Sequence, residues 1–297
     1  MRSRDQLLRT VGRVSTLRNG RIYAWRGQSR ARYDLSSSLY RHLAKSGPVD
    51  EERMRETEKR IIREARRFGL GRDLGASNSD AHLLASLQHH GVPTRLLDVT
   101  SNPFTALWFA TRRPKAGQNS AGVLFAIDVT EMPWAHTFAH DAITYAQAAE
   151  PLSAQFTLLL MKSFAERQPF RLYPAIPDDR MRAQEGYFIG SPMPDAPQVP
   201  RVPDLDLAAG SPPGADALLR LAEDSDRGVG RPARLPFLAL VIPPKVKAAM
   251  DDPLTGTFNR RRRVLFPDVD GFRDAFNYEE LDLKSPGPSY RFEVYDR

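Results

Sequence analysis

Apolar and polar positions along the chain alternate in some segments and recur at helical spacing in others. Positions around Ile22, Ala24 and Arg26 alternate as they do in a strand, and Gly27 ends the segment. This pattern predicts a short strand. Other strands are predicted from short runs of apolar residues, and one is predicted where the chain continues after a polar turn. The predicted strands cover residues 21–28, 92–101, 121–129, 180–190 and 235–243.

Several helices are marked by their start and stop residues. Asp50 precedes a segment with early acids and late bases that stops at Gly69, which predicts an amphipathic helix. Another predicted helix ends at Gly91, and Pro103 stands in the first turn of the next. The predicted helices cover residues 50–69, 81–91, 102–113, 153–167 and 244–252, with a further one around Phe272 and Phe276.

The order of these elements defines a fold class. Strands and helices alternate irregularly, which favours an α+β fold of mixed or antiparallel sheets flanked by helices over a regularly wound parallel sheet. The length of 297 residues permits one main domain with a large core. Residues 191–214 contain seven prolines, which predicts a long surface loop or lid.

The amino-acid composition limits which kinds of site and binding partner the protein can have. The absence of cysteine excludes disulfides, thiolate metal sites and cysteine nucleophiles, and it suits a reducing compartment. No secretory signal and no run of roughly 20 apolar residues is found, so we expect a cytoplasmic protein without a membrane partner. The net charge of +7 attracts nucleotide or nucleic-acid phosphates or an acidic partner, although a merely solvated surface would look the same.

Polar residues gather where the predicted strand 92–101 meets the next helix. Thr100, Ser101 and Asn102 precede Pro103, so they are expected to cap that helix whether or not they also bind a ligand. The adjacent pair His89 and His90 does not predict a metal site. Neighbouring helical side chains point about 100° apart, and no third ligand has suitable spacing.

Two stretches of the sequence resemble a known family. Residues 88–110, QHHGVPTRLLDVTSNPFTALWFA, and the triplet Trp25-Arg26-Gly27 resemble the signatures of the FRG domain. The resemblance extends to RMRAQEGYF and VLFPDVDG later in the chain. It implies a single FRG domain over residues 1–297, with a core at about 20–280.

The layout of that domain is similar to that of ADP-ribosyltransferases. Those enzymes have an aromatic-Arg-Gly on a first strand, Ser or Thr on a second strand before a helix, and a Glu on a later strand. The resemblance implies that Arg26 holds a phosphate or ribose of NAD, unless it is only a structural partner of Asp98. The later carboxylate corresponds to Gln184-Glu185, of which a strand would turn only one into the cleft. Glu279 and Glu280 are alternatives.

The implied site has two overlapping sets of residues. The expected catalytic residues are Arg26, Thr100, Gln184 and Glu185. The residues expected to contact NAD are Trp25, Arg26, Gly27, Gln88, His89, Asp98, Thr100, Ser101, Asn102, Trp108 and Tyr187. Of these, Thr100 and Ser101 would brace the nicotinamide side, and Trp108 or Tyr187 would stack on the leaving base.

These residues imply a function. NAD would be the substrate, no metal would be needed, and ADP-ribose would pass to a macromolecule, with nucleic acid favoured over protein by the basic charge. The proteins that the resemblance suggests include toxins and antiphage effectors, for which a cognate inhibitor is conceivable. Two alternatives stay open: a non-catalytic module that binds a nucleotide or nucleic acid, and an NAD glycohydrolase.

Overall fold

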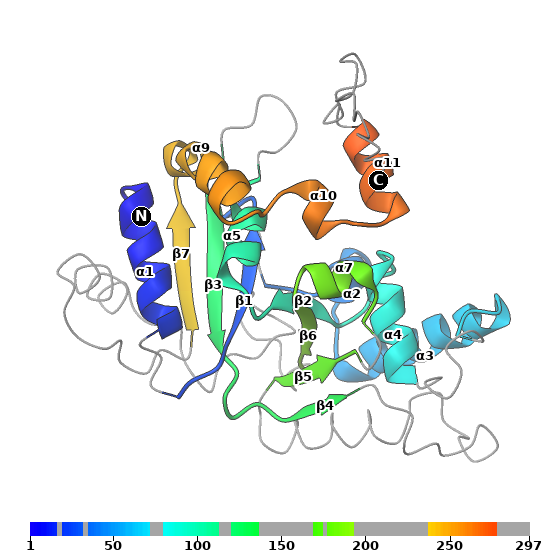
Figure 1. Cartoon of the computed structure of the whole chain (residues 1–297). Helices are drawn as coiled ribbons and strands as arrows, with labels where there is room; N and C mark the ends of the chain where they lie inside the picture. The colour runs from blue at the N-terminus through cyan, green and yellow to red at the C-terminus, as the bar shows by residue number, and fades with distance from the viewer. Residues whose placement is uncertain are drawn as a thin grey trace, which may run out of the picture.

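A seven-stranded sheet runs through the part of the chain that the structure describes (Figure 1). The computed structural model describes residues 1–16, 20–31, 35–71, 80–112, 120–136, 169–174, 177–192 and 237–277. The strands are β1 (Tyr23–Gln28), β2 (Leu97–Thr100), β3 (Gly122–Asp128), β4 (Trp134–His136), β5 (Phe170–Tyr173), β6 (Gly186–Gly190) and β7 (Phe237–Ile242). Their order is β4-β5-β6-β2-β1-β3-β7.

All neighbouring strands are antiparallel except β4 and β5, which are parallel. The pairing between β1 and β3 is long, whereas β1 and β2 share only the position where Trp25 faces Thr100. The sheet is therefore weakly joined at its middle. The mixed sheet with flanking helices confirms the α+β class.

The helices are α1 (Arg4–Thr16), α2 (Ser38–Leu43), α3 (Glu51–Arg67), α4 (Asp80–His89), α5 (Pro103–Thr111), α7 (Asp179–Ala183), α9 (Pro244–Asp252), α10 (Arg262–Leu265) and α11 (Val269–Asn277). A 3₁₀ turn follows α2 (Ala44–Ser46), and a π-helical turn follows α9 (Pro253–Thr257). The predicted start signals hold, since the side chain of Asp50 accepts from Arg53 N and Pro103 occupies the first turn of α5. None of these helices is long and apolar enough to cross a membrane.

Two predicted strands are shorter than expected. Residues 92–96 do not join the sheet, because both backbone polar groups of Thr94 are bonded to α2 instead. The segment predicted as a strand over 180–190 begins as helix α7, which Asp178 caps, and becomes β6 only at Gly186. The helix predicted at 153–167 and all but residues 191 and 192 of the segment predicted as a loop or lid lie outside the described residues.

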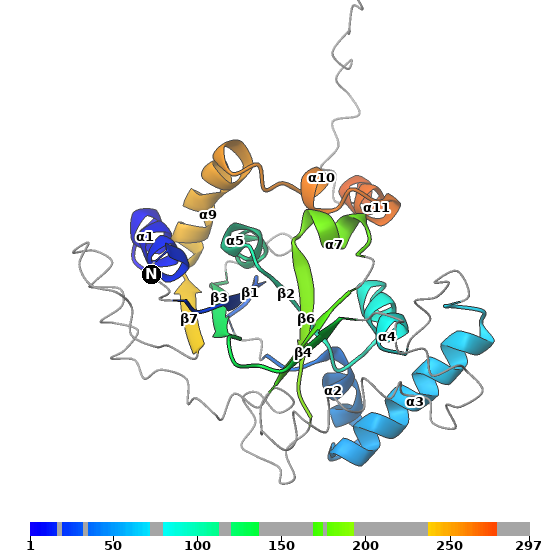
Figure 2. The same ribbon diagram turned by 60° about the horizontal axis from the view of Figure 1, so that its bottom comes forward.

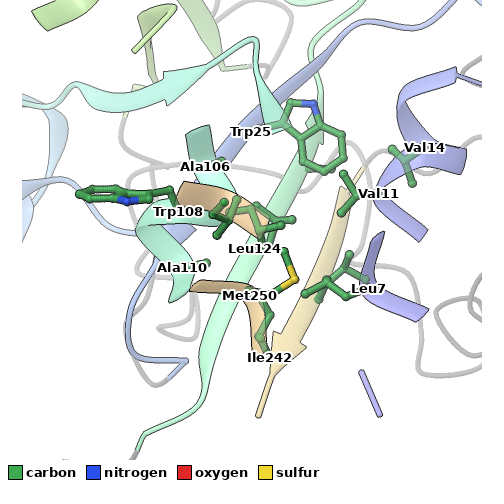
Figure 3. Close-up of a cluster of buried hydrophobic side chains, with 14 of the residues drawn as sticks. Leu7, Val11, Val14, Trp25, Ala106, Trp108, Ala110, Leu124, Ile242 and Met250 are labelled. Carbon is green, nitrogen blue, oxygen red and sulfur yellow. The ribbon is translucent and has the colours of Figure 1, made fainter. Parts of the chain in front are cut away.

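One face of β1, β3 and β7 is covered by α1, α5 and α9 (Figure 3). Trp25 and Leu124 point from the sheet into this layer, and Leu7 and Val11 of α1 pack there. The backbones come very close at Gly27, where an added Cβ would lie 2.6 Å from Ala110 N and still closer to the carbonyl oxygen of Ala106. Glycine at this position lets α5 pack directly on β1.

A second apolar cluster lies at the other end of the sheet and contains residues of α3, α4, β5 and β6. Figure 2 shows α4 between α3 and the sheet. Ile62 and Leu84 are fully buried there against Phe188. The same region contains a buried charge cluster. Arg95 is fully buried, and its guanidinium bonds the carboxylates of Glu58 and Glu51. This cluster fixes the chain just before β2.

Candidate functional site

A cavity of about 280 Å³ opens where β1 and β2 meet the ends of α4, α5 and α7. It is lined by Trp25, Arg26, Gly27, Gln88, His89, Asp98, Val99, Thr100, Thr105, Ala106, Phe109, Arg180, Met181, Gln184 and Phe266. We call Arg26, Gln88, Asp98 and Thr100 the strand wall, and Arg180, Gln184 and Phe266 the helix wall. The cavity therefore lies at the weakly joined middle of the sheet.

Arg26, Gln88 and Asp98 of the strand wall form one polar network, which extends to Thr94. Arg26 Nη1 donates to the carbonyl oxygen of Asp98 and lies 3.8 Å from its carboxylate. Gln88 Nε2 donates to Asp98 Oδ2 at 3.0 Å, while Gln88 Oε1 accepts from Thr94 Oγ1 at 2.7 Å. The ion pair expected between Arg26 and Asp98 is present. It also leaves the Asp98 carboxylate half exposed within the cavity lining.

Thr100 joins the two walls. Its hydroxyl donates to the carbonyl oxygen of Gln184 at 2.7 Å and accepts from Asn102 N at 3.0 Å. Asn102 caps α5, as expected, by accepting from Phe104 N at 2.9 Å. Ser101 donates weakly to the carbonyl oxygen of Glu185 at 3.4 Å. Thr100 lines the cavity, whereas Ser101 and Asn102 do not.

Gln184 and Glu185 occupy a turn, which corrects the expectation that they alternate along a strand. Gln184 caps the C-terminus of α7, and Glu185 has a φ of 51° that turns the chain into β6. Gln184 lines the cavity and donates to the carbonyl oxygen of Leu265 at 2.9 Å. The Glu185 carboxylate is outside the lining, bound to Asn102 Nδ2 at 2.8 Å and Arg260 Nη2 at 3.1 Å.

The two aromatic residues expected to stack on a base are not part of the lining. Trp108 is a buried residue of α5, with the guanidinium of Arg112 4.6 Å from its ring centroid. Tyr187 is buried on β6 and stacked on Tyr173 at 4.7 Å. Burial raises the pKa of Tyr187. Phe266 and Phe109 are the aromatic rings in the lining besides Trp25.

The helix wall contains residues that sequence reasoning missed. Arg180 forms a bidentate ion pair with Asp268, with nitrogen–oxygen distances of 2.6 and 2.9 Å. These hydrogen bonds lower the pKa of Asp268 below its ordinary value. Both residues fall in stretches that belong to the family resemblance, RMRAQEGYF and VLFPDVDG. Nothing in their spacing, however, predicts that they meet across 88 residues.

His89 stands between the two walls. Its Nε2 atom lies 3.3 Å from Asp178 Oδ2, and burial lowers its pKa despite that carboxylate. Burial thus favours the neutral form of this imidazole over the charged one. Within the described ranges, no group of three or more His, Asp or Glu side chains could hold a metal ion.

This α+β fold carries a cavity whose lining combines apolar side chains with two arginines, one carboxylate and several amide and hydroxyl groups. The family model of the FRG domain matches residues 21–119, which supports the FRG assignment for that part of the chain. The matched region runs from β1 through α5 and contains the whole strand wall. No curated protein and no solved structure matches the chain.

Proposed function

We propose that this chain binds NAD in the cavity and transfers ADP-ribose from it to a macromolecule. The observation that carries the proposal is the convergence of three segments far apart in sequence. β1, β2 and β6 are neighbours in the sheet, and one cavity is lined by Arg26 of β1, Thr100 of β2 and Gln184 from the turn before β6. They are the three segments in which the resemblance to ADP-ribosyltransferases places the site.

Transfer of ADP-ribose from NAD requires only a few functional groups from the protein. The bond between nicotinamide and C1′ of the ribose breaks, nicotinamide leaves with the bonding electrons, and an acceptor oxygen or nitrogen attacks C1′ and loses a proton. Positive charge develops on the ribose, so a nearby carboxylate stabilises the transition state. The guanidinium of Arg26 would hold a phosphate of NAD, and Thr100 would fix the turn that carries Gln184.

Two carboxylates can serve this role. Asp98 lines the cavity and is held by Arg26 and Gln88. Glu185 is the residue that the resemblance selects, but its carboxylate is bound to Arg260 and Asn102 outside the lining. Comparing Asp98→Asn with Glu185→Gln therefore tests which of the two acts on the ribose.

The test is incubation of the purified protein with NAD labelled in its adenosine part and a cell lysate. RNA, DNA and protein are then digested separately to find the retained label. We expect label in one fraction, lost with Arg26→Ala and with one of the two carboxylate variants. Arg21→Ala is the matched control, because Arg21 also flanks β1 and pairs with Asp128 at 3.1 Å but is not part of the cavity lining. If no partner leads to NAD consumption, the enzyme proposal is wrong.

A second candidate is a non-catalytic module that binds a nucleotide or nucleic acid. It is favoured by the position of the Glu185 carboxylate, which is paired with Arg260 instead of facing the cavity. In that case NAD or nucleotide binding survives Glu185→Gln and Asp98→Asn, and Arg26→Ala weakens it. Free nicotinamide without retained label would instead identify the third candidate, an NAD glycohydrolase.

A further inference from the structure

Four consecutive arginines adjoin the helix wall. Arg260 and Arg261 follow the π-helical turn, and Arg262 and Arg263 begin α10. The whole stretch from Pro253 to Phe266 contains no Asp or Glu. Phe266, at the end of this stretch, lines the cavity, and the carbonyl oxygen of Leu265 accepts from Gln184. Figure 2 places α10 beside α7. The arginine run is therefore at the edge of the proposed NAD site.

The run is anchored at both ends on the same helix. Phe258 stacks on Phe104 of α5 with ring centroids 4.0 Å apart. At the other end, Phe266 contacts Phe109 and Trp108 of α5, with centroid distances of 5.9 Å in both cases. The backbone that carries the arginines is thus held by aromatic packing, and a ligand does not have to order it first.

The four side chains divide into two pairs. Arg260 bonds Glu185, and Arg262 lies over the ring of Phe266 and 4.0 Å from Asp274. Arg261 contacts only a neutral partner, Asn259 Oδ1, at 2.9 Å. Within the part of the chain that the structure describes, neither Arg261 nor Arg263 forms an ion pair. Among the residues that the structure describes, no carboxylate neutralises their positive charge.

We propose that Arg261 and Arg263 bind the phosphodiester backbone of a nucleic acid at the edge of the cavity. Two unneutralised guanidinium groups with no acid between them attract successive phosphates, and each neutralised phosphate releases a counterion. That the bound nucleic acid is the acceptor of ADP-ribose rests on the proposed function. The binding itself does not, and it can be measured without NAD.

The other cationic surface, on α3, provides a control. Arg60 and Arg63 are exposed, and neither forms an ion pair within the described ranges. Five acids are interleaved with the bases of α3, however, so its field is mixed. In both Figure 1 and Figure 2, α3 lies far from α10. Replacing this pair removes the same charge from the chain at a different place.

The experiment measures fluorescence anisotropy of labelled single-stranded RNA, single-stranded DNA and duplex DNA, with no NAD present, between about 50 and 200 mM salt. The protein should bind at least one of them, and more weakly as salt rises. In Arg261→Ala/Arg263→Ala, the slope of log affinity against log salt should fall by about 1.4 for single strands or about 1.8 for duplex. Affinity near 0.1 M salt should drop roughly 25- to 60-fold.

Two further variants keep the result interpretable. Arg60→Ala/Arg63→Ala should leave the slope unchanged, and Arg261→Lys/Arg263→Lys should keep most of it, because the charge is retained. An unchanged melting temperature shows that the alanine pair is folded. The proposal is overturned if the protein binds no nucleic acid or if both alanine pairs weaken binding equally. It is also overturned if the four arginines bind only an acidic protein. NAD turnover could survive any of these results, so the two proposals fail separately.

Discussion

The two walls of the cavity are held in place by different kinds of interaction. The strand wall follows a buried ion cluster, in which Glu58 and Arg95 are both fully buried. The helix wall is held by partly exposed pairs, Arg180 with Asp268 and Arg260 with Glu185. Breaking a buried pair leaves an uncompensated charge in the interior, whereas an exposed pair is screened by water. The strand wall should therefore be the rigid side of the site.

The two walls also differ in whether the FRG-domain model matches them. Residues 21–119 include the strand wall and the ion cluster behind it, and they exclude the whole helix wall. The FRG-domain match thus covers the half of the cavity that we expect to be rigid. The other half, which carries both Gln184 and the arginine run, lies outside it. Variants of each wall test this contrast.

The largest effect is expected from Glu58→Gln. This change removes one of the two carboxylates that bond the buried guanidinium of Arg95, at nitrogen–oxygen distances down to 2.6 Å. We expect a loss of about 3–5 kcal/mol in the free energy of unfolding, measured by urea denaturation. The control is Glu56→Gln, an exposed partner of Lys59, which should cost less than about 1 kcal/mol. Equal losses would mean that the buried cluster does not hold the strand wall.

A smaller effect is expected from Gly27→Ala. The new methyl group would overlap the carbonyl oxygen of Ala106 and lie 2.6 Å from Ala110 N, both of which are backbone atoms of α5. Because β1 and α5 must separate to make room, we expect a loss of about 1–3 kcal/mol in thermal or urea unfolding. Gly12→Ala, in α1, meets nothing within 4 Å and should stabilise by about 0.5–1 kcal/mol. A neutral result at Gly27 would contradict the direct packing of α5 on β1.

The smallest effect belongs to the helix wall and depends on pH. Arg180 lowers the pKa of Asp268 below its ordinary value of 3.8. A carboxylate with a lowered pKa contributes stability above its unfolded pKa, and that contribution is lost as the pH falls through the folded value. The difference in unfolding free energy between the wild type and Asp268→Asn should be at most about 1 kcal/mol near neutrality.

That difference should shrink as the pH falls below 3.8, which urea denaturation at several pH values can follow. Asp179→Asn is the control, since Asp179 pairs with Arg182 on the same helix with both side chains largely exposed. A difference that grows on acidification would show that Asp268 is not stabilised by Arg180 in the folded protein.

Local signals in the sequence predicted much of the fold. Asp50, Pro103 and Gly91 mark helix ends in the sequence and do so in the structure, because capping and left-handed turns depend on residues close together in the chain. The strands predicted at 121–129 and 235–243 are β3 and β7, which are apolar because the sheet is covered there. These elements need no long-range information.

The site was predicted in part. Arg26, Asp98 and Thr100 come together in the cavity lining, and all three lie in stretches of the sequence that resemble the FRG domain. Gln184 and Glu185 were assigned to a strand because α7 is too short to produce a clear helical period. The position of Glu185 outside the lining depends on Arg260, 75 residues later. Contacts of that kind are decided by tertiary packing, which a single sequence does not reveal.

The single paired position between β1 and β2 bears on which fragments of the protein can fold alone. A fragment limited to residues 21–119 would keep these strands but lose β3, β6 and β7. The outer edges of β1 and β2 would then present unpaired amide and carbonyl groups, which recruit other chains and lead to aggregation. We therefore expect that a fragment which folds alone must extend through β6 and β7, well beyond the residues that match the family model.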